Sequence, residues 1–125
     1  MTAIATRYAG TFHGRAEEVS RVRREVAYYL GECPVADDVV LIADELAANC
    51  VLHTHSRSEF FRVRCELSAE SVRLEVEDMG GPWRRRKQDG RPHGLDIVEA
   101  LTGPDAWGIE TTHDGGRIVW ARLTW

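Results

Sequence analysis

The feature that most limits the fold of this chain is a change in hydrophobic period near residue 60. Before it, apolar residues recur every three or four positions over residues 15–30 and 35–53, which predicts two amphipathic helices. After it, apolar and charged residues alternate over residues 61–67 and 72–77, which predicts two antiparallel strands joined by a hairpin turn. Two helices followed by such a hairpin indicate helices layered on one face of a sheet.

Shorter elements complete one predicted domain, residues 1–125, a length sufficient for a two-layer fold with its own core. Residues 79–93 are rich in glycine, proline and charge and predict a long loop, of a kind that is often functional. The remaining pattern predicts an edge strand, a short helix and a closing hairpin, at residues 9–12, 94–101, and 106–111 with 117–123. We therefore expect an α+β, two-layer sandwich with a mostly antiparallel sheet and helices on one face.

The second predicted helix supplies most of the expected core. Asp37 and Asp38 lie in its first turn, where negative charge suits the helix dipole. The positions expected to be buried are its large aliphatic residues, namely Val39, Leu41, Ile42, Leu46, Val51 and Leu52.

Composition and charge narrow the class of protein. Hydrophobic residues make up 43% of the chain, as in ordinary globular domains, and the formal net charge of -4 argues against a nucleic-acid or anionic-membrane binder. We see no secretory signal and no apolar run near the roughly 20 residues that span a bilayer. Cys33, Cys50 and Cys65 are odd in number and lack CxxC spacing, which favours reduced thiols and a cytoplasmic protein.

A carboxylate and an amide lie one turn apart in the second predicted helix. In the segment ADELAANCVLH, Glu45 and Asn49 are at positions i and i+4, so their side chains share one face. A solvated polar face would show the same pattern. The pair also suits magnesium chemistry, because an amide oxygen can bind the ion while a carboxylate orients or deprotonates a nucleophile.

Two later segments contain the other candidate residues. In VEDMGG, Asp78 ends a predicted strand and is followed by Gly80, which is typical of a plain turn. Alternatively, the carboxylate accepts a hydrogen bond from an exocyclic amine, and Gly80 lets a base approach the backbone. In GRPHGLDIV, Gly94 opens a predicted helix, either as a simple cap or as an anion site formed by backbone amides.

Taken in order, these segments and the closing GGRIVWARL resemble the ATP-binding (Bergerat) fold of gyrase, Hsp90-type chaperones, histidine kinases and MutL, the GHKL superfamily. The resemblance runs from about residue 12 to residue 123 and includes the bacterial anti-sigma-factor serine kinases. It implies an ATP- and Mg²⁺-dependent regulatory protein. As a serine/threonine kinase of that type, it would phosphorylate an antagonist protein and sequester a sigma factor, and it would form a homodimer.

The resemblance also implies a role for each candidate residue. Asn49 would coordinate Mg²⁺, and Glu45 would be the general base that activates a hydroxyl. Asp78 would accept the adenine amino group, with Gly80 beneath the base.

Three further residues follow from the same resemblance. Gly94 and Leu95 would present backbone amides to the phosphates. His53 occupies a position that is often histidine in such proteins, where it would contact the phosphates or a lid, or cap the helix end as a buried residue.

The chain departs from the family pattern in its last strand and in its loop. Ile118 occupies the position in the last strand where relatives usually have a threonine near the adenine. We therefore expect one polar contact to the base to be missing. The lid, residues 81–93, is short and keeps only part of the usual glycine run. Its basic run, Arg84, Arg85, Arg86 and Lys87, is either solvated or closes over the γ-phosphate or an acidic partner.

These departures leave a second function open: a non-catalytic switch that binds ATP and acts through protein contacts. A stand-alone ATPase is less favoured, because the chain lacks the dimer-gating domains that couple hydrolysis to movement in larger relatives.

Overall fold

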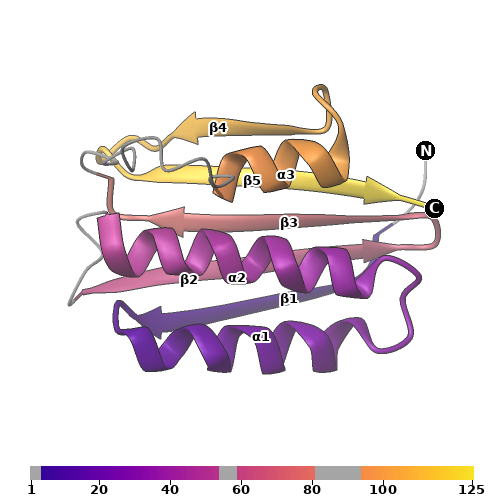
Figure 1. Ribbon diagram of the computed structural model, residues 1–125, viewed down its shortest axis with the longest axis horizontal. Helices are drawn as coiled ribbons and strands as arrows, with labels where there is room; N and C mark the ends of the chain where they lie inside the picture. Colours follow the sequence, from indigo (N-terminus) through magenta and orange to yellow (C-terminus); the bar gives the residue numbers. More distant parts are fainter. Residues whose placement is uncertain (1–3, 54–58, 81–93) are drawn as a thin grey trace.

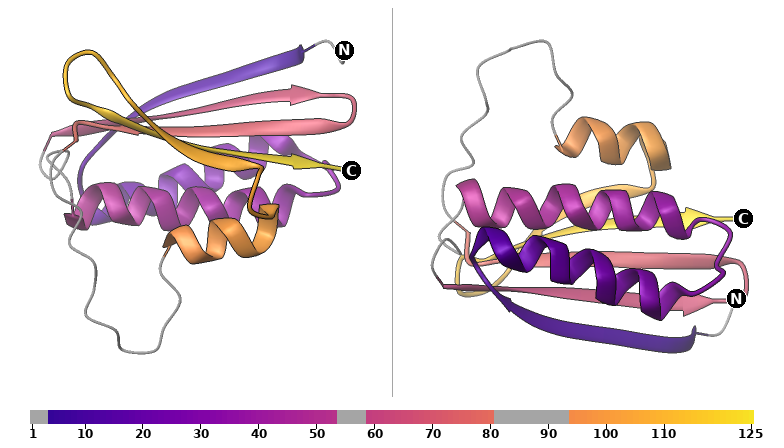
Figure 2. Two further views of the ribbon diagram at one scale, coloured as in Figure 1. Left: turned by 90° about the horizontal axis from the view of Figure 1, so that it is seen from above. Right: turned by 60° about the horizontal axis from the view of Figure 1, so that its bottom comes forward.

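The computed structural model describes residues 4–53, 59–80 and 94–125, which form one sheet with helices on one face. The sheet has five antiparallel strands in the order β1-β2-β3-β5-β4. Figure 1 shows the helices in front of the sheet, and Figure 2 places them all on the same side. The predicted α+β architecture is confirmed. The elements are β1 (Ile4–His13), α1 (Ala16–Leu30), α2 (Ala36–His53), β2 (Phe60–Ser68), β3 (Ser71–Asp78), α3 (Gly94–Thr102), β4 (Trp107–Thr111) and β5 (Arg117–Thr124).

α1 is an amphipathic helix that packs one side on the sheet. Val22, Val26 and Leu30 are buried, at the spacing that the sequence shows. The helix ends at Gly31, which has a φ of 55° and donates its N–H to the carbonyl oxygen of Ala27 at 3.0 Å. This left-handed glycine and its hydrogen bond close the last turn of the helix.

α2 lies between α1 and α3 and buries the side that faces the sheet (Figures 1 and 2). Val39, Ile42 and Leu46 are buried, as predicted. The prediction was wrong for Leu41 and Leu52, which are 42% and 51% exposed. The sheet covers α2 on one side and a helix lies at each flank, so only its outward side remains in solvent. Leu41 and Leu52 lie on that outward side.

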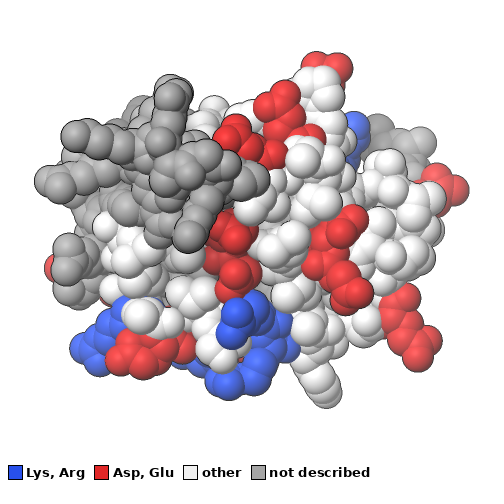
Figure 3. Space-filling model, in the orientation of Figure 1, with Lys and Arg blue, Asp and Glu red and all other residues white. Residues whose placement is uncertain are grey.

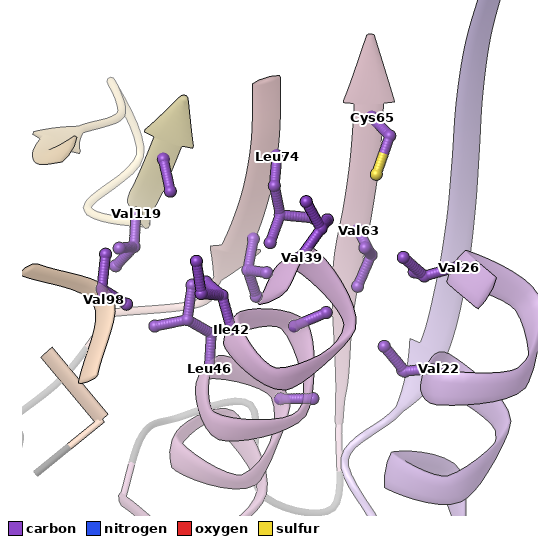
Figure 4. Close-up of a cluster of buried hydrophobic side chains, with 14 of the residues drawn as sticks. Val22, Val26, Val39, Ile42, Leu46, Val63, Cys65, Leu74, Val98 and Val119 are labelled. Atoms are coloured by element: carbon purple, nitrogen blue, oxygen red, sulfur yellow. The ribbon is translucent and has the colours of Figure 1, made fainter. Parts of the chain in front are cut away.

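The core lies between the helices and the sheet (Figure 4). Phe12 of β1 and Phe61 of β2 stack with ring centroids 5.6 Å apart, and both are almost completely buried. Full burial of one such side chain contributes about 1.5–3 kcal/mol. Side chains from all three helices meet those of the strands, among them Val22, Val26, Ile42, Leu46, Val98, Val63, Leu74 and Val119. This packing holds α2 and α3 on the sheet and so positions the residues between them.

None of the described helices lies over the other face of the sheet (Figure 2). Charged residues on this face pair across strands. Arg64 lies 3.1 Å from Glu75 and 2.9 Å from Glu77, measured from guanidinium nitrogen to carboxylate oxygen. The guanidinium carbon of Arg73 lies 4.6 Å from the ring centroid of Trp120. We refer to this surface as the open face. None of the described helices is both long and apolar enough to cross a bilayer.

Candidate functional site

Glu45 and Asn49 lie on the flank of α2 that faces α3. Successive residues of an α-helix are rotated by about 100° around its axis. Cys50 is buried against the sheet, and Asp44 reaches α1, where its Oδ1 lies 3.2 Å from Nη1 of Arg23. The same rotation places Glu45 and Asn49 on the opposite flank, and both are partly buried there. The two side chains therefore share one flank, as their spacing predicts.

Asp78 is the only buried charged side chain in the described parts of the chain, with 4% of the residue exposed. It is the last residue of β3, and its side chain lies on the helix side of the sheet, like that of the buried Val76. The Gly80 N–H donates to Oδ1 at 2.6 Å, and the Arg117 Nε–H donates to Oδ2 at 3.4 Å. A buried carboxylate needs such donors. Because it offers about four lone-pair sites, it also has the capacity to accept a further hydrogen bond.

Cys50 connects α2 to the end of β3. It directly follows Asn49 and is 2% exposed. Burial raises the pKa of its thiol well above the usual range, and the negative charge of Asp78 raises that pKa further, whereas Arg117 lowers it. α2 packs on β3, and Cys50 and Asp78 are both buried between the helices and the sheet. The turn of α2 that carries Asn49 therefore packs toward the strand that Asp78 ends.

Gly80 is required by its own backbone and by contact with the turn between β4 and β5. Its φ is 80°, in the region that favours glycine. A Cβ at this position would overlap the carbonyl oxygen of Gly115. A Cβ on Gly116 would likewise lie 2.9 Å from the carbonyl oxygen of Asp78. The segment after β3 thus packs directly on this turn, which gives Gly80 a structural role beside the predicted approach of a base.

α3 begins at Gly94, as the sequence predicts. Leu95 is partly buried and packs against the core, and Val98 is fully buried, so these side chains hold the helix on the sheet. Because the Leu95 side chain packs against the core, only its backbone amide is suited to donate a hydrogen bond to a phosphate. Asp96 lies in the same first turn, where its charge complements the helix dipole but repels an anion.

The helix side of the molecule is divided by charge. Figure 3 shows basic side chains mainly where α1 runs and acidic side chains over α2 and α3. α2 begins with Asp37 and Asp38, and α3 carries Asp96 and Glu99. Phosphates that enter beside α2 and α3 would meet negative charge, which a bound cation would offset.

The sequence analysis did not identify Arg117 and expected Ile118 to be the residue of the last strand that lies near the base. In the β3–β5 register, Asp78 is opposite Arg117 and Glu77 is opposite Ile118. Because side chains alternate between the faces of a sheet, Arg117 shares the helix side with Asp78, and Ile118 lies on the open face. The sequence of β5 contained a signal for this. Its buried residues are every second one, Val119, Ala121 and Leu123, and the same alternation continued two residues towards the N-terminus reaches Arg117.

A cavity of about 150 Å³ opens beside Asp78 at the end of the sheet. β2, β3 and the turn between β4 and β5 form its walls, which include Phe61, Met79 and Gly116. None of the described side chains of α2 contributes to it. This cavity is therefore separate from the flank of α2 that carries Glu45 and Asn49.

Some of the predicted features cannot be placed from the described residues. His53 is the last residue of α2, but its side chain is not among those described. Residues 81–93 lie outside the described part of the chain, and with them the lid and the basic run of residues 84–87.

A family model described as histidine kinase-like ATPase domain matches residues 12–120. The chain belongs to this family. The match includes α2, Asp78, Gly80, and the start of α3, so the resemblance drawn from the sequence is confirmed. Membership of an ATPase family implies that the domain binds a nucleotide.

A solved structure gives the same result for the fold. The RsbU and RsbW domains of Rv1364c from Mycobacterium tuberculosis are similar to the chain, with a TM-score of 0.74 and 20% sequence identity. The similarity covers 96% of this chain and 32% of that chain, so this family member spans about a third of the protein it matches. No curated protein matches the chain in sequence.

Proposed function

We propose that this chain is a protein serine/threonine kinase of the anti-sigma-factor type, which uses ATP with Mg²⁺. The observation that carries the proposal is the position of Glu45 and Asn49. They share the α3-facing flank of α2, the helix that packs on the strand ending at the buried Asp78. A domain that only bound nucleotide would have no evident need for a carboxylate such as Glu45 beside the metal ligand.

Binding uses groups from three elements. Asp78 accepts a hydrogen bond from the exocyclic amine of adenine, and the backbone at Gly80 lies close to the base. The amide oxygen of Asn49 suits Mg²⁺, a hard ion that prefers oxygen ligands and usually keeps several waters beside phosphates. The first backbone amides of α3, at Gly94 and Leu95, face the phosphates. His53, at the end of α2, contributes to the same phosphate end of the site.

Phosphate transfer uses Glu45. Its carboxylate takes the proton from a serine or threonine hydroxyl of the partner protein, and the hydroxyl oxygen forms a bond to the γ-phosphorus. The bond from that phosphorus to the bridging oxygen breaks, and ADP leaves. Mg²⁺ supplies charge neutralisation at the phosphates when it is bound.

The proposed partners are a sigma factor, which the chain would hold inactive, and an antagonist protein, which it would phosphorylate. The naming of an RsbW domain in the similar structure supports this class of partner. We also propose that the chain acts in the cytoplasm and forms a homodimer.

Nucleotide binding is tested by titration of Mg-ATP, followed by calorimetry. We expect Asn49→Ala and Asp78→Asn each to weaken binding at least tenfold, because each removes a charge-assisted or metal contact. Asp44→Asn is the matched control, since Asp44 lies on the opposite flank of α2 and pairs with Arg23. Equal affinity in all four proteins would refute the assigned site.

Phosphate transfer is tested with γ-labelled ATP, Mg²⁺ and candidate antagonist proteins. We expect Glu45→Gln to bind ATP as the wild type does and to transfer phosphate about 10²–10⁴ times more slowly. If no antagonist gains phosphoserine or phosphothreonine while ATP binding is intact, the kinase proposal fails.

One observation favours the second function, a non-catalytic ATP-dependent switch. In the sequence, the phosphate loop keeps only part of the family's glycine run, with Arg91, Pro92 and His93 between Gly90 and Gly94, which would weaken the hold on the γ-phosphate that transfer needs. A switch of this kind would keep its regulation of the partner in Glu45→Gln. Loss of that regulation with unchanged ATP affinity would exclude the switch and leave the kinase.

A further inference from the structure

Arg117 and Asp78 present a donor and an acceptor side by side at the base end of the candidate site. They are the first residue of β5 and the last residue of β3, directly opposite each other in the register. The Arg117 Nε lies 3.4 Å from Asp78 Oδ2, and the two side chains are only 18% and 2% exposed. A planar guanidinium carries five N–H donors in a rigid fork, so it can serve a carboxylate and a second acceptor at the same time.

The other donor next to Asp78 is already committed. The Gly80 N–H points at Asp78 Oδ1 over 2.6 Å, and the positive φ and close packing of Gly80 hold it there. A base that placed its amine on Asp78 would have a ring nitrogen acceptor immediately beside that amine. Of the two donors that hold Asp78, the guanidinium of Arg117 is the one able to reach this second atom.

We infer that Arg117 is a second base-recognition residue, which donates a hydrogen bond to adenine N1 while Asp78 accepts from the neighbouring 6-amino group. This assignment rests on the proposed ATP site. Separating a buried ion pair is costly, because it leaves an uncompensated charge in the interior. The base therefore binds across the intact pair, and Arg117 determines specificity as well as balancing the charge of Asp78.

The test compares ATP with 1-deaza-ATP, in which N1 is replaced by a C–H group, and with 7-deaza-ATP as a control analogue. Dissociation constants of the magnesium complexes are measured by calorimetry. The wild type is expected to bind 1-deaza-ATP about tenfold or more weakly than ATP, the effect of one lost charge-assisted hydrogen bond. 7-Deaza-ATP should bind as ATP does. Equal affinity for ATP and 1-deaza-ATP would overturn the inference.

Two variants then assign the donor. Arg117→Met keeps the apolar stem and removes every donor, so it should bind ATP about tenfold more weakly and no longer distinguish ATP from 1-deaza-ATP. A residue that only held Asp78 in place would weaken both nucleotides equally and leave their ratio unchanged. That result would overturn the inference, as would ATP binding in Arg117→Met at least as tight as in the wild type.

Arg117→Lys provides a second measurement in case Arg117→Met does not fold. Its ammonium keeps a positive charge beside Asp78 but lacks the forked geometry, so it should fold and lose most of the discrimination. Full discrimination in this variant would overturn the inference. Arg122→Ala is the matched control, because Arg122 is on the same strand, is exposed, and should leave the ratio unchanged. A wild type that bound no nucleotide would instead refute the proposed function itself.

Discussion

Replacing Gly80 by alanine separates the structural role of this glycine from its predicted role beneath a base. The φ of Gly80 is 80°, a conformation that costs a residue with a Cβ about 1–2 kcal/mol. The added Cβ would also overlap the carbonyl oxygen of Gly115, which belongs to the backbone of the turn between β4 and β5. Forcing atoms into such a packed position costs about 1–3 kcal/mol more. We therefore expect Gly80→Ala to lower the free energy of unfolding by about 2–5 kcal/mol.

Gly103→Ala is a matched control for the conformational part of this cost. Gly103 has a φ of 92°, but nothing lies within 4 Å of the Cβ that alanine would add. It should therefore lose only about 1–2 kcal/mol, and the difference between the two variants measures the contact with the turn.

Urea unfolding followed by circular dichroism, without nucleotide, supplies both values. If Gly80→Ala were no less stable than Gly103→Ala, the contact between the end of β3 and the turn would contribute nothing to the free energy of unfolding. If Gly80→Ala matched the wild type in stability and lost only ATP affinity, approach of a base would be the sole reason for the glycine.

Three further perturbations test the core, the charge pairs and the exposed surface. Phe61→Ala should lower the free energy of unfolding by about 3–5 kcal/mol in urea titrations, because it empties the stacked pair with Phe12. The hydrogen bond from Arg21 lowers the pKa of Glu25 in the folded protein below its ordinary 4.5. The ionised Glu25 therefore contributes its full stabilisation above pH 4.5, and this stabilisation is lost as the pH falls through the lowered pKa of the folded state. Glu25→Gln should therefore be less stable than the wild type at neutral pH and equal to it in acid, as measured by unfolding at a series of pH values. Tyr28 is 91% exposed, so Tyr28→Ser should change stability by no more than about 0.5 kcal/mol while weakening the proposed homodimer in light-scattering measurements.

The layer architecture was predictable because each element carries its own period in the sequence. The alternation in β2 and β3 and the helical spacing in α1 are local signals, and burial follows them closely. The limits of α2 were predictable, but its outward side was not. Periodicity shows that a helix has an apolar stripe, whereas the exposure of Leu41 and Leu52 depends on how many elements pack around that helix.

The candidate site was predictable where its residues are close in sequence. Glu45 and Asn49 share a flank because helix geometry alone requires it. The contacts of Gly80 were not predictable, because they join the end of β3 to a turn some 35 residues later through the packing of the sheet. The partner of Asp78 depends likewise on the pairing of β3 with β5, which are not consecutive strands.

The register of β3 and β5 can itself be tested by substitution at Ile118. If Ile118 were next to the base, as the sequence suggested, Ile118→Thr would restore a polar contact and tighten ATP binding. The structure places Ile118 opposite Glu77, on the same open face as Trp120 and Arg73. We therefore expect Ile118→Thr to leave the ATP dissociation constant unchanged within about twofold and to cost about 1 kcal/mol of stability. Calorimetry on Ile118→Thr beside Arg117→Met measures the contrast, and a tighter complex in Ile118→Thr would show that the strand register is different.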